Sequence, residues 1–160
     1  SRGASKVIGV DLVDYRVRFA ENKGFVDNAI NPRELDVVKE IKRLTGGKGV
    51  DAVIESAGSV KAFETGMKVA GMGAKILIFG VTPEASLARL RPFDIYRREL
   101  SIMGSFINPF TTERAIKVLY SKMVNVRDLI SHIVGLKELD RYYERIESKE
   151  DNVMKVIVKP

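Results

Sequence analysis

Short apolar runs alternate along the whole chain with longer segments in which apolar residues recur every three or four positions. The apolar runs predict strands, and the periodic segments between them predict helices. Strands are expected at residues 6–10, near Phe25 and Val26, and at residues 50–56, 74–79, 100–106, 131–136 and 153–160. Helices are expected at residues 12–22, from Pro32 up to a stop at Gly46 and Gly47, and at residues 59–70, 111–123 and 137–146. This alternation is typical of an α/β fold with a doubly wound parallel sheet, covered by helices on both faces.

The expected helix after residue 31 carries start and stop signals. Asn31 can cap it, Pro32 suits its first position, and Glu34 stands in capping-box register with Asn31. Two glycine-containing stretches, "TGGKGV" at 45–50 and "GMGAK" at 71–75, follow expected helices and precede expected strands. A phosphate-binding loop needs the opposite order, so we interpret both stretches as helix ends.

The first apolar run ends at Asp11, and Arg16 follows five residues later. Ligands bind at the carboxyl ends of the strands in an open parallel sheet. A carboxylate there can accept hydrogen bonds from both hydroxyls of an adenosine ribose, and its charge repels a 2′-phosphate, which favours NAD over NADP. The Arg16 guanidinium could stack on the adenine or steady the ribose. Asp11 could equally serve as an N-cap of the following helix, and both roles remain open at this point.

A glycine-rich turn normally lies about 20 residues before such an acid, between the first strand and its helix. Only ten residues precede Asp11, so the G-x-G-x-x-G turn is not in this chain. We expect the turn and the first strand upstream of Ser1 on a longer chain, or on another molecule.

Composition narrows the classes of function. The chain has no cysteine and a single histidine, and its net charge is +6 from 27 Lys and Arg against 21 Asp and Glu. The absence of cysteine fits a reducing cytoplasm, and no apolar run is long enough to cross a bilayer. The basic residues are interleaved with acidic ones, as on solvated helix faces, so we expect neither nucleic acid nor membrane as a partner. A nucleic-acid-binding function would rest on the net charge alone.

Several stretches in a fixed order carry a family resemblance. They are "GASKVIGVDLVDYR", "VDNAINP", "TGGKGVDAVIESAGS", "KILIFGV", "PFDIYRRELSIMGSFINP", "LISHIVGLKELDRYYERI" and "KVIVKP". Together they resemble the C-terminal part of the medium-chain zinc-dependent alcohol dehydrogenases, most closely the sorbitol and polyol dehydrogenase branch. The resemblance implies that residues 1–160 are a partial NAD-binding Rossmann domain, and that the N-terminal zinc catalytic domain is absent from this chain.

The resemblance also implies contacts with the coenzyme. Ala57 and Gly58 resemble a tight strand end beside the coenzyme, and core packing is the alternative role for Val81 and Phe106. The implied cofactor-binding residues are Asp11 and Arg16 at the adenosine ribose, Phe79, Gly80 and Val81 along the nicotinamide, Ser105 and Phe106 on a second nicotinamide-side segment, and Lys155 near the phosphates.

The zinc ligands of the family pattern are missing from this chain. Family members hold the catalytic zinc through Cys, His and acidic residues of the absent domain, and one imidazole, His132, cannot make a three-ligand site. We therefore expect no catalytic residue and no metal ligand in this chain, and zinc only in the intact protein.

The first strand is also missing. Strand 1 is central in the order 3-2-1-4-5-6, so its loss separates strands 2 and 3 from strands 4, 5 and 6. Each unpaired buried backbone group costs about 1–3 kcal/mol, against a domain stability of about 5–15 kcal/mol. We expect that the 160 residues alone do not make a stable, NAD-competent monomer.

The resemblance implies an enzyme that transfers hydride from a secondary alcohol, such as a polyol, to NAD. It implies a homodimer or homotetramer, for which residues 85–106, "ASLARLRPFDIYRRELSIMGSF", resemble the family's dimer region. An ordinary edge strand guarded by arginines is the alternative for that stretch. A non-catalytic nucleotide-binding or assembly module derived from the family is the alternative function.

Overall fold

The computed structural model describes residues 3–107, 109–148 and 152–160. They form two compact units, one of Pro32–Pro109 and one that combines Ser1–Asn31 with Phe110–Pro160. No described helix has both the length and the apolar character needed to span a membrane.

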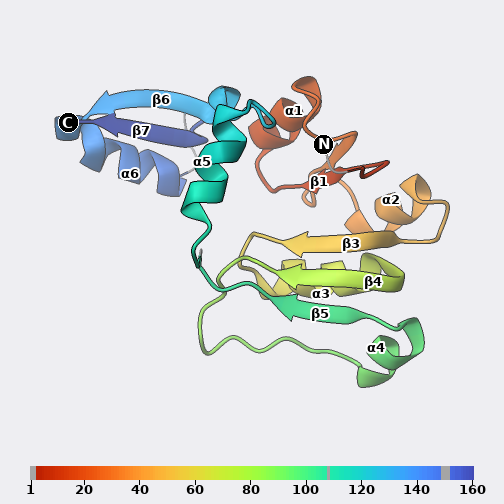
Figure 1. Cartoon of the computed structure of the whole chain (residues 1–160). Coiled ribbons are helices and arrows are strands. Elements are labelled where there is room, and N and C mark those ends of the chain that lie inside the picture. The colour runs from red at the N-terminus through yellow and green to blue at the C-terminus, as the bar shows by residue number, and fades with distance from the viewer. Residues whose placement is uncertain (1–2, 108, 149–151) are drawn as a thin grey trace. The chain divides into compact units, whose positions relative to one another are not determined.

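The unit of Pro32–Pro109 contains a three-stranded parallel sheet (Figure 1). Its strands lie in the order β3-β4-β5, so β3 and β5 are the edges. The elements of this unit are α2 (Val37–Leu44), β3 (Val50–Glu55), α3 (Val60–Val69), β4 (Ala70–Ile78), α4 (Pro92–Arg98) and β5 (Ser101–Gly104).

The core of this unit lies between α3 and one face of the sheet. Phe63 and Met67 of α3 pack with Ala74 and Ile76 of β4, and Ala74 and Ile76 have no accessible surface. Side chains that alternate to the other face are exposed, Ile54 by 67%. Within this unit, α3 covers one face of the sheet.

The other unit contains two parallel strand pairs, each connected through a helix. The first pair is β1-β2 and the second is β6-β7, which Figure 1 shows beside α6. The elements of this unit are β1 (Ile8–Val10), α1 (Asp14–Asn22), β2 (Asn28–Ile30), α5 (Thr112–Tyr120), the 3₁₀ helices η1 (Arg127–Leu129) and η2 (Leu136–Glu138), β6 (Ile130–Gly135), α6 (Leu139–Ser148) and β7 (Lys155–Lys159).

The predicted fold class is confirmed. Helices and strands alternate, and every described strand pair is parallel. The expected separation is also confirmed, because β1-β2 form one group and β3-β4-β5 another.

Two predictions at the start of the chain are wrong. The second strand is Asn28–Ile30 rather than the segment near Phe25 and Val26, because the N–H of Phe25 still bonds to Ala20 O at the end of α1. Helix α2 begins at Val37 and not at Pro32.

The cap of α2 is Asp36 rather than Asn31. The Asp36 carboxylate accepts the N–H groups of Val38 and Lys39 at 2.9 and 3.1 Å. Asn31 is buried at the end of β2, and its side-chain amide donates to the Asp14 carboxylate. Aspartate is as good an N-cap as asparagine, and Asp36 directly precedes the apolar residues of α2 that face the core. Asp36 therefore takes the cap position in place of Asn31.

The predicted end of α3 at "GMGAK" needs a correction. Helix α3 ends at Val69 and β4 begins at once, so Gly71 and Gly73 lie inside the strand. A Cβ on Gly71 would lie 2.7 Å from Lys48 O, which leaves room only for glycine where the backbone before β3 approaches β4. The "TGGKGV" stretch does end α2, with Gly46 and Gly47 at positive φ.

Helix α4 was not predicted. It occupies part of residues 85–106, begins with Pro92 and precedes the edge strand β5. The Arg98 guanidinium donates to Met67 O and Ala70 O, both at 3.0 Å. The basic side chain thus satisfies carbonyls at the end of α3.

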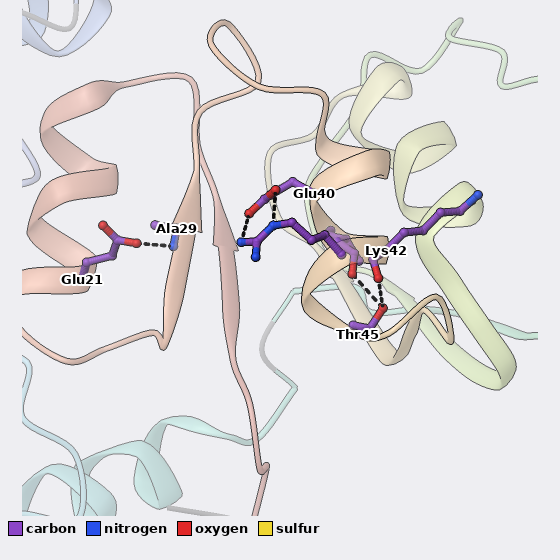
Figure 2. Close-up of polar contacts among 7 residues, drawn as sticks. Glu21, Ala29, Glu40, Lys42 and Thr45 are labelled. Carbon is purple, nitrogen blue, oxygen red and sulfur yellow. Dashed lines mark hydrogen bonds and ion pairs between the residues drawn. The ribbon is translucent and has the colours of Figure 1, made fainter.

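Helix α2 also carries an ion pair, between Glu40 and Arg43, that lowers the pKa of Glu40. The Glu40 carboxylate accepts two hydrogen bonds from Arg43, at 2.9 and 2.5 Å, drawn as dashed lines in Figure 2. These hydrogen bonds, together with the charge of Arg43, lower the pKa of Glu40 below its ordinary value.

Candidate functional site

Asp11 and Arg16 come together at the carboxyl end of β1. Arg16 Nη1 lies 3.7 Å from Asp11 Oδ2, and both side chains are about one-third exposed, at 35% and 38%. Asp11 Oδ1 accepts the N–H of Val13 at 2.9 Å. Val13, not Asp11, is the N-cap of α1, so Asp11 shapes the turn before the helix without capping it.

Side chains in the same unit fix the position of this strand end. Glu21 of α1 accepts the N–H of Ala29 in β2 at 2.8 Å (Figure 2). Asp27 accepts the N–H of Val7 at 2.6 Å, and Asn31 bonds to Asp14. These bonds tie α1 and the residues beside it to the strand pair whose first strand ends at Asp11.

Asp11 and Arg16 are the charged residues that line a hollow of about 270 Å³. The rest of its lining is apolar and includes Val10, Val17 and Ala29. A polar pair beside apolar walls is the arrangement expected of a small-molecule site.

A second group of predicted residues gathers at the carboxyl ends of β4 and β5. The N–H of Ser105 donates to Ile78 O at 3.0 Å, which joins the segments after the two strands. Val81 is 91% exposed and Phe106 is 84% exposed. Neither side chain therefore packs in the core of its own unit.

The segment after β4 also contacts the turn after β3. The N–H groups of Phe79 and Gly80 donate to Glu55 O at 2.8 and 2.7 Å. A Cβ on Gly80 would lie 2.2 Å from Gly58 N, and Gly58 itself has a φ of +64°. Both positions require glycine, because backbone meets backbone there.

Lys155 begins β7, in the same unit as Asp11. Its N–H donates to Ser131 Oγ at 3.3 Å, and its side chain is exposed. Neighbouring His132 is engaged locally, with Nδ1 at 3.0 Å from Ser131 Oγ and its ring 5.1 Å from that of Tyr142. These contacts indicate that His132 has a local packing role.

Among the described residues, no group of three or more His, Cys, Asp or Glu side chains is arranged to hold a metal ion.

Glu55 is not among the site residues predicted from the sequence. It ends β3 with 4% of its surface exposed, and its Oε1 accepts the N–H groups of Ala57 and Ser59. An acid directly after the apolar residues "AVI" at 52–54 was the available signal, because charged side chains are rarely buried without a role.

Comparison with known proteins gave consistent matches. A family model described as "Zinc-binding dehydrogenase" matches residues 1–121. An alcohol dehydrogenase from Cupriavidus necator is 32% identical over 161 residues, which cover 99% of this chain and 43% of that protein. Sorbitol dehydrogenase from Bacillus subtilis is 30% identical over 158 residues, which cover 99% and 44%.

A solved structure from Sinorhizobium meliloti 1021, assigned to a zinc-binding dehydrogenase and bound to NADP, has a TM-score of 0.88. It is 32% identical, and the match covers 99% of this chain and 46% of that one. The chain thus spans less than half the length of these relatives.

Proposed function

Since this chain belongs to the zinc-binding dehydrogenase family, we propose that it is the coenzyme-binding part of a longer dehydrogenase. In that proposal residues 1–160 form a partial Rossmann domain, and the zinc-binding catalytic domain lies on a part of the protein outside this chain. The observation that carries the proposal is the Asp11–Arg16 pair at the carboxyl end of β1, where open parallel sheets bind nucleotides.

NAD is the proposed coenzyme, and Asp11 is the residue that selects it. The carboxylate would accept the ribose hydroxyls, while its negative charge would repel a 2′-phosphate. The Sinorhizobium meliloti structure is bound to NADP, so the proposed preference of this chain for NAD rests on the Asp11 carboxylate alone. Arg16 would face the adenosine, and Lys155 supplies a positive charge for the phosphates.

The backbone of Phe79, Gly80 and Val81, with Ser105 and Phe106, is proposed for the nicotinamide end. The close contact between Gly80 and Gly58 fixes the path of this backbone, along which the nicotinamide ring would lie. When bound, the nicotinamide would supply the hydride acceptor, and the chain's own residues would bind and orient it.

A secondary alcohol is the proposed substrate of the intact protein, and a polyol is the proposed class. Relatives named alcohol dehydrogenase and sorbitol dehydrogenase support this class, and the chain matches 43–46% of the length of each. We place the protein in the cytoplasm as a homodimer or homotetramer that associates through residues 85–106.

Nucleotide affinity tests this proposal directly. Isothermal titration of the natural polypeptide that carries this chain should show NAD⁺ binding at least about tenfold more tightly than NADP⁺. Asp11→Ser should weaken NAD⁺ binding and remove the discrimination, because the repelling charge is gone. Asp140→Ser, an equal charge change on the exposed face of α6, is the matched control and should leave both affinities unchanged.

Failure to bind either nucleotide, or equal affinities in the wild type, would overturn the proposal. A denatured mass of the natural polypeptide well above 17.8 kDa supports the longer enzyme. A mass of 17.8 kDa together with nucleotide binding favours the non-catalytic module instead.

A further inference from the structure

Glu55 joins two segments that follow neighbouring strands. Its Oε1 accepts the N–H groups of Ala57 at 2.9 Å and Ser59 at 3.4 Å, which closes the turn from β3 into α3. Its carbonyl oxygen accepts the N–H groups of Phe79 and Gly80, which follow β4. One residue thus accepts four backbone donors, two from each segment.

The two segments touch through their backbones. A Cβ on Gly58 would lie 2.3 Å from Val81 O, and a Cβ on Gly80 would lie 2.2 Å from Gly58 N. Real Cβ contacts are never this short, so the turn after β3 sets where the backbone of residues 79–81 can lie. Any movement of that turn is transmitted to those residues by direct contact.

The burial of Glu55 indicates more than turn closure. The residue is 4% exposed, and its Oε2 is buried without a hydrogen-bond partner among the described residues. Burying a carboxylate with one oxygen unsatisfied carries a desolvation penalty that a serine or asparagine at this turn would avoid. Oε2 lies beside Gly80, 2.9 Å from the position that a Gly80 Cβ would take.

We propose that Glu55 is the positioning residue for the nicotinamide end of the coenzyme site. It acts through the 57–59 turn and the Gly58–Gly80 contact, and it touches no reacting atom. This inference rests on the proposed function, which assigns Phe79–Val81 to the nicotinamide. It predicts that Glu55 affects binding of the nicotinamide half of the coenzyme and not of the adenosine half.

The test compares two ligands on a matched pair of variants. Glu55→Gln keeps a carbonyl oxygen that can accept from Ala57 and Ser59, whereas Glu55→Met has similar volume and no such acceptor. Affinities for NAD⁺ and for ADP-ribose, which lacks the nicotinamide, are measured by titration of the natural polypeptide. Glu55→Met should weaken NAD⁺ about tenfold and ADP-ribose less than about twofold, while Glu55→Gln stays near wild type.

Two results would overturn the inference. Equal loss of both ligands in Glu55→Met would show a general structural role, and unchanged NAD⁺ affinity would show no positioning role. If Glu55→Met does not fold, Glu55→Asp replaces it, because its carboxylate is one methylene too short to reach Ser59, and the same selective loss is expected.

Failure of the proposed function has a different signature. In that case the wild type either binds neither NAD⁺ nor ADP-ribose, or binds NAD⁺ and NADP⁺ with equal affinity. Where the proposed function holds, Asp11→Ser weakens both ligands together, because both contain the adenosine ribose, and this pattern is distinct from that of Glu55→Met.

Discussion

At the scale of single residues, the strongest constraint is the space around Gly80. Gly80→Ala should destabilise its unit by about 1–3 kcal/mol, because the added methyl meets the backbone of Gly58 and neither segment can give way. Gly104→Ala is the matched control, since its Cβ would enter open space at the end of β5. Urea denaturation of both variants checks this, and equal midpoints would contradict it.

The Glu40 carboxyl gives a pH-dependent prediction. Its pKa is lowered by hydrogen bonds from Arg43, so the pair stabilises α2 above the ordinary pKa of glutamate, and this contribution disappears as the pH falls through the lowered value. Arg43→Met should return the Glu40 pKa toward its ordinary value. An NMR titration of the Glu40 side-chain carboxyl carbon measures both values, and an unmoved pKa in Arg43→Met contradicts the assignment.

At the scale of elements, Asp36 decides where α2 begins. Asp36→Ala should cost about 0.5–2 kcal/mol, because the N–H groups of Val38 and Lys39 lose their acceptor. Hydrogen exchange at those two amides should accelerate in Asp36→Ala and not in Asn31→Ala. The opposite result would restore Asn31 as the cap.

The type and order of most elements could be predicted from the sequence, because the strand and helix periods of apolar residues differ along most of the chain. Boundaries were less predictable where two signals compete, as with Asn31 and Asp36, which are both good caps within six residues. Helix α4 was missed because its seven residues include too few apolar repeats to show a period. Strand β4 extends back through Gly71, since tertiary contact with residue 48 overrides the usual role of glycine as a helix end.

Only part of the candidate site could be predicted from the sequence. The Asp11–Arg16 pair depends on residues five positions apart, so a local pattern was enough to indicate their proximity. The role of Glu55 depends on donors at positions 79 and 80, and nothing in the local sequence shows that these segments meet. Contacts between neighbouring strands become visible only once the register of β3 against β4 is known.

At the scale of the whole molecule, the chain exposes an unusual amount of surface. Its accessible area is 12446 Å², whereas two separate compact bodies of half its mass would together expose about 9,600 Å². Exposed apolar residues include Ile54, on the sheet-edge strand β3, as well as Val81 and Phe106. Surface of this kind is normally covered by further protein.

The isolated 160-residue chain should therefore self-associate or bind the dye ANS. Light scattering after size exclusion should give a mass above 17.8 kDa, and Ile54→Lys should reduce the association by placing a charge on the edge strand. A monodisperse 17.8 kDa species with cooperative unfolding and no ANS binding would show that the chain is stable alone.

The contact between Gly58 and Gly80 also limits how this protein can vary. A side chain added at either position meets main-chain atoms of the opposite segment, so shrinking a neighbouring side chain makes no room for it. Ordinary core positions accept a larger residue when a partner becomes smaller, and such paired changes let sequences drift. These two glycines have no such partner. In a library of random variants selected for folding, both positions should stay unchanged, and second-site suppressors of their mutants should not map to the side chains around them.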